Sequence, residues 1–348
     1  MKMKRYFYLA LSVLAAASCA KTPSAGPNDD AKLYFEAWMQ VHHPGAVRTA
    51  LGAYVLEDVP GTGAAVGSKE DDPYVRVEYV VSGLDGAVTG TNIESVAKQI
   101  GEYAFGNYYG PAVWNRGQDL LAAGIDEAIS SMRVGGRRTI ALPGWLQSTE
   151  RYDTGQEYLD RVAGGTPMIY EIRLHEIVSD LVQWETDSLG SYIPRTFPGK
   201  TVLDSLEFGF YYFRTAEPLD EEEFPSDTTI YINYIGRLLN GTVFDTNIKD
   251  SAKFYGIYSA SRTYGPSSVT FSKDSGEDDG GEDGTETGVT MGSSSVIPGF
   301  AKTLLQMHAY EKGSGLFYST FGYGSSGSGY TIPAYSPLRF DIEIVDKP

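Results

Sequence analysis

The chain of 348 residues contains a tandem repeat, and this feature limits its fold more than any other. The segment "YVRVEYVVSGLDG" at 74–86 aligns with "TIYINYIGRLLNG" at 229–241. Further on, "TNIESVAKQIGEYAFGNYYGP" at 91–111 aligns with "TNIKDSAKFYGIYSASRTYGP" at 246–266. Both alignments have the same offset of 155 residues. Because two separate segments rarely share an offset by chance, the chain is expected to hold two copies of one domain.

Each copy has the pattern of an α+β domain. The alternating stretches "VRVEYVV" and "IYINYIGRL" predict strands, and the D-G or N-G that follows predicts a hairpin turn. A last alternating strand closes each copy, at 167–177 and at 337–345. Between them, apolar residues at i, i+4 and i+7 predict one amphipathic helix. These residues are Ile125, Ile129 and Met132 in the first copy, and Phe300, Leu304 and Met307 in the second. We therefore expect two antiparallel sheets, each wrapped around one short α-helix.

The N-terminus has the pattern of a secretory signal. Lys2, Lys4 and Arg5 precede the apolar stretch "YFYLALSVLAAAS", which is too short for a permanent membrane span and predicts a signal peptide over 1–18. Cys19, the one cysteine of the chain, follows A-A-S and resembles the end of a bacterial lipobox, although Ala16 stands where Leu is usual. The resemblance implies cleavage before Cys19 and its acylation, for example with palmitate. The alternative is an ordinary signal peptide with an incidental cysteine.

Composition shifts along the chain divide it into segments. Residues 274–288 contain seven acidic groups and almost nothing apolar, so we expect a disordered acidic insertion; the Asp and Glu spacing fits no EF-hand or RTX calcium site. Pro194 and Pro198 indicate a linker between the copies. The predicted segments are a signal peptide 1–18, a lipidated tether 19–45, a first domain 46–180, a linker 181–200 and a second domain 201–348.

The charge of the chain excludes some partners. Its formal net charge is −17, which becomes −20 once Lys2, Lys4 and Arg5 leave with the signal. Such a surface repels nucleic acids and anionic lipid headgroups, so we expect no nucleic-acid partner. Attachment to a membrane would therefore depend on the acyl chains. With a single cysteine, no intramolecular disulfide can form.

Residues that usually carry catalysis are scarce. The four histidines, His42, His43, His175 and His308, lie at neither metal nor triad spacing, and no nucleophilic cysteine remains once Cys19 is acylated. We therefore expect no metal and no cofactor.

A glycine motif near the C-terminus is also not a cofactor loop. Gly322, Gly324 and Gly327 have the G-x-G-x-x-G spacing of a dinucleotide loop, but such a loop opens a helix. Here it runs into Pro333, Pro337 and an alternating strand. The loop therefore needs another explanation.

Three motifs of the second copy carry a family resemblance. In order, "INYIGRLLNGTVFDT", "VIPGF" and "GYGSSGSGYTIPAYSPLRFDIEI" resemble the FK506-binding-protein (FKBP) family of peptidyl-prolyl cis-trans isomerases, also called rotamases. Each motif alone is common, whereas the ordered combination is specific. The resemblance covers about residues 200–348, and the first copy is a weaker match over about 50–178.

The resemblance implies a pocket built from particular residues. Phe300 would form its floor, where the family usually has Trp, and the backbone N–H of Ile297 would hold a ligand carbonyl. The glycine loop would then be a flap beside the pocket. The catalytic residues so implied are Tyr234, Phe244, Asp245, Ile297 and Tyr323, and the substrate pocket would add Val296, Phe300, Ile332 and Phe340.

The first copy departs from this pattern. It has Thr89-Gly90 where the second has Phe244-Asp245, Leu121-Ala122 opposite Val296-Ile297, and Ile125 for Phe300. Its loop "ALPGWLQSTERYDTGQ" has no Y-G element. We interpret it as a degenerate FKBP-like domain that acts as a spacer or binding surface.

Two functions follow from these observations. The first is a prolyl isomerase and folding helper for exported proteins, lipid-anchored in the bacterial outer membrane, with proline-containing unfolded or newly exported polypeptides as substrates. The second is a non-catalytic FKBP-fold lipoprotein that serves as a chaperone or as a subunit of an envelope protein complex. The substitution of Trp by Phe300, the degenerate first copy and the acidic insertion favour the second.

Overall fold

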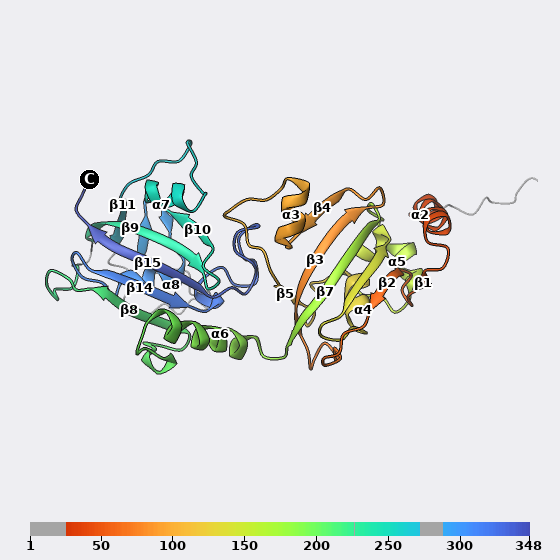
Figure 1. Cartoon of the computed structure of the whole chain (residues 1–348), viewed down its shortest axis with the longest axis horizontal. Coiled ribbons are helices and arrows are strands. Elements are labelled where there is room, and N and C mark those ends of the chain that lie inside the picture. The colour runs from red at the N-terminus through yellow and green to blue at the C-terminus, as the bar shows by residue number, and fades with distance from the viewer. Residues whose placement is uncertain (1–25, 226, 272–287) are drawn as a thin grey trace, which may run out of the picture.

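The structure is a computed structural model that describes residues 26–225, 227–271 and 288–348. The predicted signal peptide, Cys19 and nearly all of the acidic insertion 274–288 lie outside these ranges. Within them, no helix is both long and apolar enough to cross a membrane. Figure 1 shows two lobes, with the N-terminal half of the chain in one and the C-terminal half in the other; the helix α6 (Leu181–Thr196) lies along the second lobe, and a short segment before it leads from the first.

The first domain contains one antiparallel sheet in the order β1-β2-β6-β7-β3-β4, and β5 also pairs with β3. Its strands are β1 Val47–Arg48, β2 Tyr54–Val59, β3 Tyr74–Gly83, β4 Val88–Thr91, β5 Ala112–Asn115, β6 Arg137–Leu142 and β7 Met168–Val178. Its helices are α2 Asp29–His42, α3 Glu94–Ile100, α4 Ala123–Ile129 and α5 Gly155–Arg161.

The second domain contains a sheet in the order β13-β12-β11-β9-β15-β14-β8, and β10 also pairs with β9. Its strands are β8 Phe210–Ala216, β9 Thr229–Leu238, β10 Val243–Thr246, β11 Ser267–Phe271, β12 Val289–Met291, β13 Ser294–Ser295, β14 Lys312–Phe317 and β15 Leu338–Val345. The helices on this side are α6 Leu181–Thr196, α7 Lys249–Phe254 and α8 Pro298–Leu304.

The two sheets have the same connectivity. In the first, β3 lies beside β7 and β7 beside β6; in the second, β9 lies beside β15 and β15 beside β14. The D-G and N-G turns join β3 to β4 and β9 to β10, and Gly86 and Gly241 there have φ of 82° and 94°. The α+β fold expected from the repeat is thus confirmed, with two copies of one topology.

The repeated sequence T-N-I fastens the hairpin in each domain. Asn92 Oδ1 accepts a hydrogen bond from the Tyr79 amide at 2.7 Å, and Asn247 Oδ1 accepts one from the Tyr234 amide at 2.9 Å. The preceding threonine donates to the carbonyl of the same tyrosine in both copies. These side-chain hydrogen bonds take the place of the bonds between paired strands at the end of a strand. The repeated T-N-I motif is therefore explained by a structural role rather than by a catalytic one.

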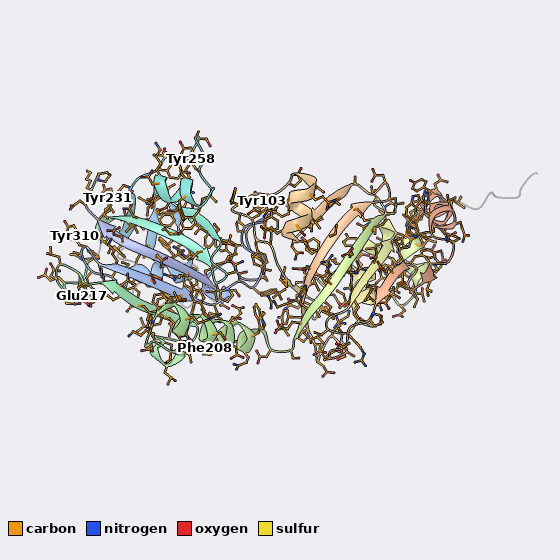
Figure 2. The ribbon with its side chains drawn as sticks, in the orientation of Figure 1. Tyr103, Phe208, Glu217, Tyr231, Tyr258 and Tyr310 are labelled. Carbon is orange, nitrogen blue, oxygen red and sulfur yellow. The ribbon has the colours of Figure 1, made fainter. Side chains whose placement is uncertain are left out.

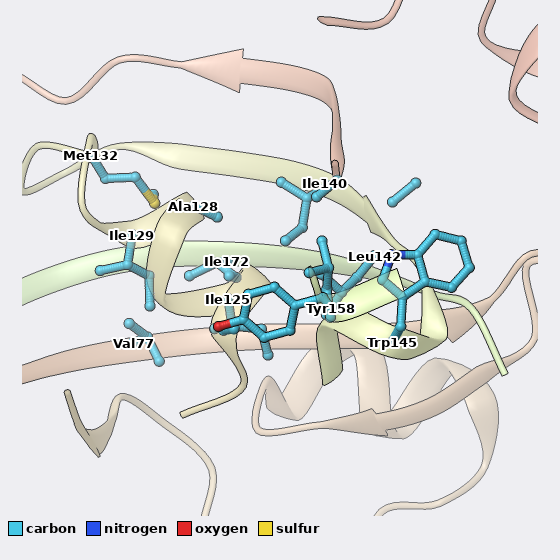
Figure 3. Close-up of a cluster of buried hydrophobic side chains, with 14 of the residues drawn as sticks. Val77, Ile125, Ala128, Ile129, Met132, Ile140, Leu142, Trp145, Tyr158 and Ile172 are labelled. Carbon is cyan, nitrogen blue, oxygen red and sulfur yellow. The ribbon is translucent and has the colours of Figure 1, made fainter. Parts of the chain in front are cut away.

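The core of each domain lies between the sheet and one short helix. The predicted helix residues are all buried, with Ile129 on α4 and Leu304 on α8 fully so, and Met132 and Met307 just beyond the last turns. Figure 3 shows the side chains of α4 together with Ile140 and Ile172 of the sheet, with Trp145 at one end of the cluster. The predicted i, i+4, i+7 pattern therefore marks the packed face.

The tether predicted over 19–45 extends too far toward the C-terminus, because its second half belongs to the first domain. Helix α2 packs Phe35 and Met39 into the core of the first domain. Asn28, just before it, donates from Nδ2 to the carbonyls of Leu159 and Val162 at 2.7 and 2.6 Å. Residues 28–42 thus belong to the first domain, because the apolar face of the helix is covered only there.

The segment 181–200, for which two prolines indicated a linker, contains the helix α6. Leu189 and Ile193 of α6 pack against Tyr211 and Phe213 of β8. Glu185 is buried and accepts hydrogen bonds from the amide and hydroxyl of Ser319. The segment that connects the domains is therefore attached to the second one.

Candidate active site

Three aromatic rings from different elements meet in the second domain. Tyr234 on β9, Phe300 on α8 and Phe340 on β15 are each 4% exposed. The Phe300 ring lies edge-on to both others, with centroid distances of 5.7 Å to Tyr234 and 5.0 Å to Phe340. Rings in this arrangement attract one another beyond the area that they bury. They form the centre of the predicted site.

A polar group borders these rings. The Tyr234 hydroxyl donates to Asp245 Oδ2 at 2.8 Å and accepts from Arg262 Nη2 at 3.1 Å. Arg262 Nη1 also pairs with Asp245 Oδ1. Burial and then the nearby Asp245 carboxylate raise the pKa of the Tyr234 hydroxyl above its usual value. Tyr234 therefore keeps its proton at any physiological pH and remains the donor of the hydrogen bond to Asp245.

Phe244 lies over a glycine of the neighbouring strand. A Cβ atom built on Gly236 would lie 2.7 Å from the Phe244 ring and 2.8 Å from the Phe340 ring. The Phe244 and Phe340 centroids are 5.6 Å apart at 78°. The absence of a side chain at Gly236 thus makes room for both rings on the sheet.

The start of α8 brings a backbone donor to the same region. Val296 and Ile297 are partly buried and pack against the aromatic cluster. Among the residues that the structure describes, none accepts a hydrogen bond from the Ile297 amide. None of these described residues thus competes with a ligand carbonyl for this N–H, which is the role that the family resemblance implies.

The glycine loop 322–336 lies at the same cluster and is called the flap below. Ile332 is buried in the cluster, whereas Tyr323 is 36% exposed. Burial raises the pKa of the Tyr323 hydroxyl, and the negative charge of nearby Asp245 raises it further. Gly327 has φ of 60°, and a Cβ there would lie 2.3 Å from the Ile332 carbonyl oxygen. The glycines of the motif thus let the flap fold back on itself.

All nine predicted pocket residues therefore gather around one cluster. The buried rings of Tyr234, Phe300 and Phe340 fill its centre, so a substrate would rest on the rim. The rim residues are Phe244, Asp245, Val296, Ile297 and Tyr323, which are partly exposed. The roles of these residues in binding and catalysis stay predictions.

Two residues of the site were not predicted from the sequence. Arg262 reaches the Tyr234–Asp245 pair from a distant loop, and no motif links it to them. Gly236 did carry a signal, because the repeat aligns it with Val81. A glycine in a strand where the other copy has valine indicates close approach by another group.

The first domain lacks these features. Thr89, Gly90 and Asn107 occupy the positions of Phe244, Asp245 and Arg262, and Val81 fills the position of Gly236. A hollow of about 310 Å³ lies there, bordered by Thr89, Gly90 and Asn107, and by Tyr330 of the flap. The loops after α3 and α7 still match: Tyr103 stacks on Tyr109 as Tyr258 stacks on Tyr264, and Figure 2 labels the first ring of each pair.

The histidines have structural contacts. His42 stacks on Trp38, His175 lies 3.1 Å from a Glu78 carboxylate oxygen, and His308 pairs with the buried Glu311. Over 26–225, 227–271 and 288–348, no three His, Cys, Asp or Glu residues are grouped so that they could hold a metal ion.

The sequence of the second domain matches a known family. Residues 269–345 match the profile described as FKBP-type peptidyl-prolyl cis-trans isomerase. The second domain is an FKBP domain. With the repeated sheet topology, the chain is a tandem of FKBP-like domains.

Relatives of this family extend the likeness. The chain is similar to peptidyl-prolyl cis-trans isomerase FKBP53 of Arabidopsis thaliana, with 27% identity over 49% of this chain and 27% of the relative. It is similar to a short-type peptidyl-prolyl cis-trans isomerase of Methanocaldococcus jannaschii, with 37% identity over 20% of this chain and 44% of the relative. The crystal structure of the three FKBP domains of wheat FKBP73 aligns at 15% identity over 84% of this chain and 94% of that one, with a TM-score of 0.30. The chain spans less than half the length of these two curated relatives.

Proposed function

We propose that the second domain catalyses the cis–trans isomerisation of peptide bonds that precede proline. The reaction has a barrier of about 18–20 kcal/mol because twisting the amide breaks its resonance. Without a catalyst it takes roughly tens to hundreds of seconds. An isomerase needs only to bind the twisted amide more tightly than the planar one.

The observation that supports this proposal is the pairing of an aromatic rim with two hydrogen-bond donors, the Ile297 N–H and the Tyr323 hydroxyl, that have no acceptor among the residues that the structure describes. Phe244 and the buried rings beneath it offer an apolar surface for the proline ring. A planar amide is more dipolar than a twisted one, so a surface that excludes water disfavours the planar ground state. The Ile297 N–H and the Tyr323 hydroxyl would hold the carbonyl of the twisted amide. No proton is transferred in this mechanism.

We further propose that the substrates are unfolded or newly exported polypeptides, and that the chain is anchored by acylated Cys19 in the bacterial outer membrane. The signal-like N-terminus and the lipobox-like Cys19 support the anchor. Metabolic labelling with palmitate tests it: label should enter the wild-type chain and not Cys19→Ala, and globomycin should cause the uncleaved precursor to accumulate. Label in both variants would contradict the proposal.

The catalytic proposal is tested by proline-limited refolding of a model protein with the full chain. Wild type should accelerate the slow phase, and Phe244→Ala with Tyr323→Ala should abolish the effect. Tyr310→Phe is a matched control, because its hydroxyl pairs with Asp346 on the surface, outside the site. An unchanged slow phase with wild type would instead favour the second candidate, a non-catalytic chaperone or complex subunit. The specific observation that favours this candidate is Phe300, which stands where the family usually has Trp.

A further inference from the structure

The flap of the second domain touches the first domain at two anchored points. The amide of Tyr108 donates to the Tyr330 carbonyl at 2.8 Å. Asn115 Nδ2 donates to the Tyr335 hydroxyl at 2.9 Å in a buried position. In Figure 1 the flap, drawn in blue before β15, extends from the second lobe toward the orange segment around α3. The loop beside the predicted active site is thus shared between the domains.

Tyr335 is held in an unusual backbone conformation at this contact. Its φ is 58°, in the left-handed region that side chains other than glycine seldom adopt. The residue is nevertheless only 8% exposed, and its ring lies edge-on to Tyr74 of β3 with a centroid distance of 5.4 Å. Strain of this kind persists only where the surroundings impose it. Here the side chain of Tyr335 is held by Tyr74 and Asn115 of the first domain, and its amide by Gly324 of the flap.

The anchors connect directly to the rim of the site. The Tyr335 amide donates to the Gly324 carbonyl at 2.8 Å, next to Tyr323; the amides of Gly322 and Gly324 also donate to the Ser319 carbonyl, so Tyr335 adds to the bonds that place Tyr323. The amide of Ser328 donates to the Ile332 carbonyl at 2.7 Å, which closes the turn that carries the Tyr330 anchor. A displacement of either anchor would therefore move Tyr323 or Ile332.

The lost site of the first domain explains why the contact can form. Thr89 and Gly90 replace a large ring and a carboxylate, and they leave the hollow that Tyr330 borders. The ring of Tyr108 packs against the core of the second domain, at a position where the second copy has Thr263. The first copy has thus both lost the residues of the site and gained a residue that contacts its neighbour.

We propose that the first domain is a positioning element for the flap: Asn115 and Tyr108 hold Tyr335 and Tyr330, and thereby fix Tyr323 and Ile332 at the rim. The expected change in KM rests on the proposed isomerase function, whereas the contact between the flap and the first domain does not. A flap held in advance binds substrate with less loss of conformational freedom. Loosening it should therefore raise KM and leave kcat almost unchanged.

The test uses the full chain with Tyr335→Phe, which removes only the hydroxyl, and with Asn115→Ala. Amide hydrogen exchange is followed over 323–335 and over β3, β9 and β15, and kcat and KM are measured with a prolyl peptide. The loss of one hydrogen bond should raise flap exchange about fivefold. The strands should keep their protection, KM should rise by a similar factor, and the double variant should add little. Tyr310→Phe should change none of these values.

The outcomes separate the two proposals. If flap exchange does not change in Tyr335→Phe and Asn115→Ala, the first domain does not hold the flap. If exchange rises but KM does not, the flap is held without positioning the site, and the inference is overturned. If the wild-type chain has no isomerase activity, the proposed function fails, while the exchange data still decide whether the first domain holds the flap.

Discussion

The substitution Gly236→Ala tests the placement of Phe244 at the site. The new Cβ would lie 2.7 Å from the Phe244 ring and 2.8 Å from the Phe340 ring, whereas ordinary contacts begin at 3.4 Å. The partly exposed Phe244 ring should move outward by about 0.7 Å, the difference between these distances, and the β9 backbone must also shift away from the buried Phe340 ring by about 0.6 Å. A displacement near 1 Å at a catalytic surface can cost about 10²-fold in rate. We therefore expect kcat/KM to fall about tenfold.

The stability of this variant should change much less than its activity. Overpacking costs about 1–3 kcal/mol, and replacing glycine within a strand returns about 0.5–1 kcal/mol. The free energy of unfolding should thus fall by at most about 2.5 kcal/mol, which is a measurable shift in urea denaturation. Gly90→Ala is the matched control, because nothing lies within 4 Å of the Cβ it would add. It should keep full activity. Full activity in Gly236→Ala as well would refute the placement of Phe244.

Three further predictions concern stability. Burial raises the pKa of the Glu185 carboxyl above its usual value of 4.5, so the folded state holds this proton to a higher pH than the unfolded state does; the free energy of unfolding of wild type, relative to Glu185→Gln, should fall as pH rises from 4.5, and a pH-independent difference would contradict this. Phe35→Ala should lower the free energy of unfolding of the first domain by about 3–5 kcal/mol in urea denaturation. Leu33→Ala, on the exposed face of α2, should lower it by less than about 0.5 kcal/mol. Equal small effects would mean that α2 is not part of the core. Tyr234→Phe should cost about 1 kcal/mol, because Asp245 keeps its pairing with Arg262, and a loss no larger than that of Tyr310→Phe would argue against the partly buried hydrogen bond between Tyr234 and Asp245.

The features that the sequence predicted well are local or repeated. Neighbouring residues determine the alternation in β3 and β9, the D-G and N-G turns, and the i, i+4, i+7 spacing of α4 and α8. Because the two copies align at a constant offset, each of these predictions could be compared with its counterpart in the other copy. The gathering of the candidate site residues followed from the family resemblance. Periodicity alone could not have predicted that β9 and the flap meet at the same site, because a local pattern does not say which distant segments lie together.

The features that were missed depend on contacts between distant segments. The apolar positions Phe35 and Met39 have helical spacing, but only the fold shows that a core covers them. Arg262 is 28 residues from Tyr234, and its guanidinium reaches the site through the path of an entire loop. The buried hydrogen bond of Asn115 and Tyr335 joins residues 220 positions apart. These pairings have no sequence period, so only a three-dimensional structure reveals them.

The central claim is that the rim around Phe244 and Tyr323 accelerates rotation about an X-Pro bond. Nuclear magnetic resonance exchange spectroscopy on a short prolyl peptide, with a catalytic amount of the full chain, measures this rotation directly. The account predicts exchange peaks between the cis and trans forms with wild type, and their loss with Phe244→Ala combined with Tyr323→Ala. Shifted peptide resonances without any exchange would mean binding without catalysis, and would contradict it.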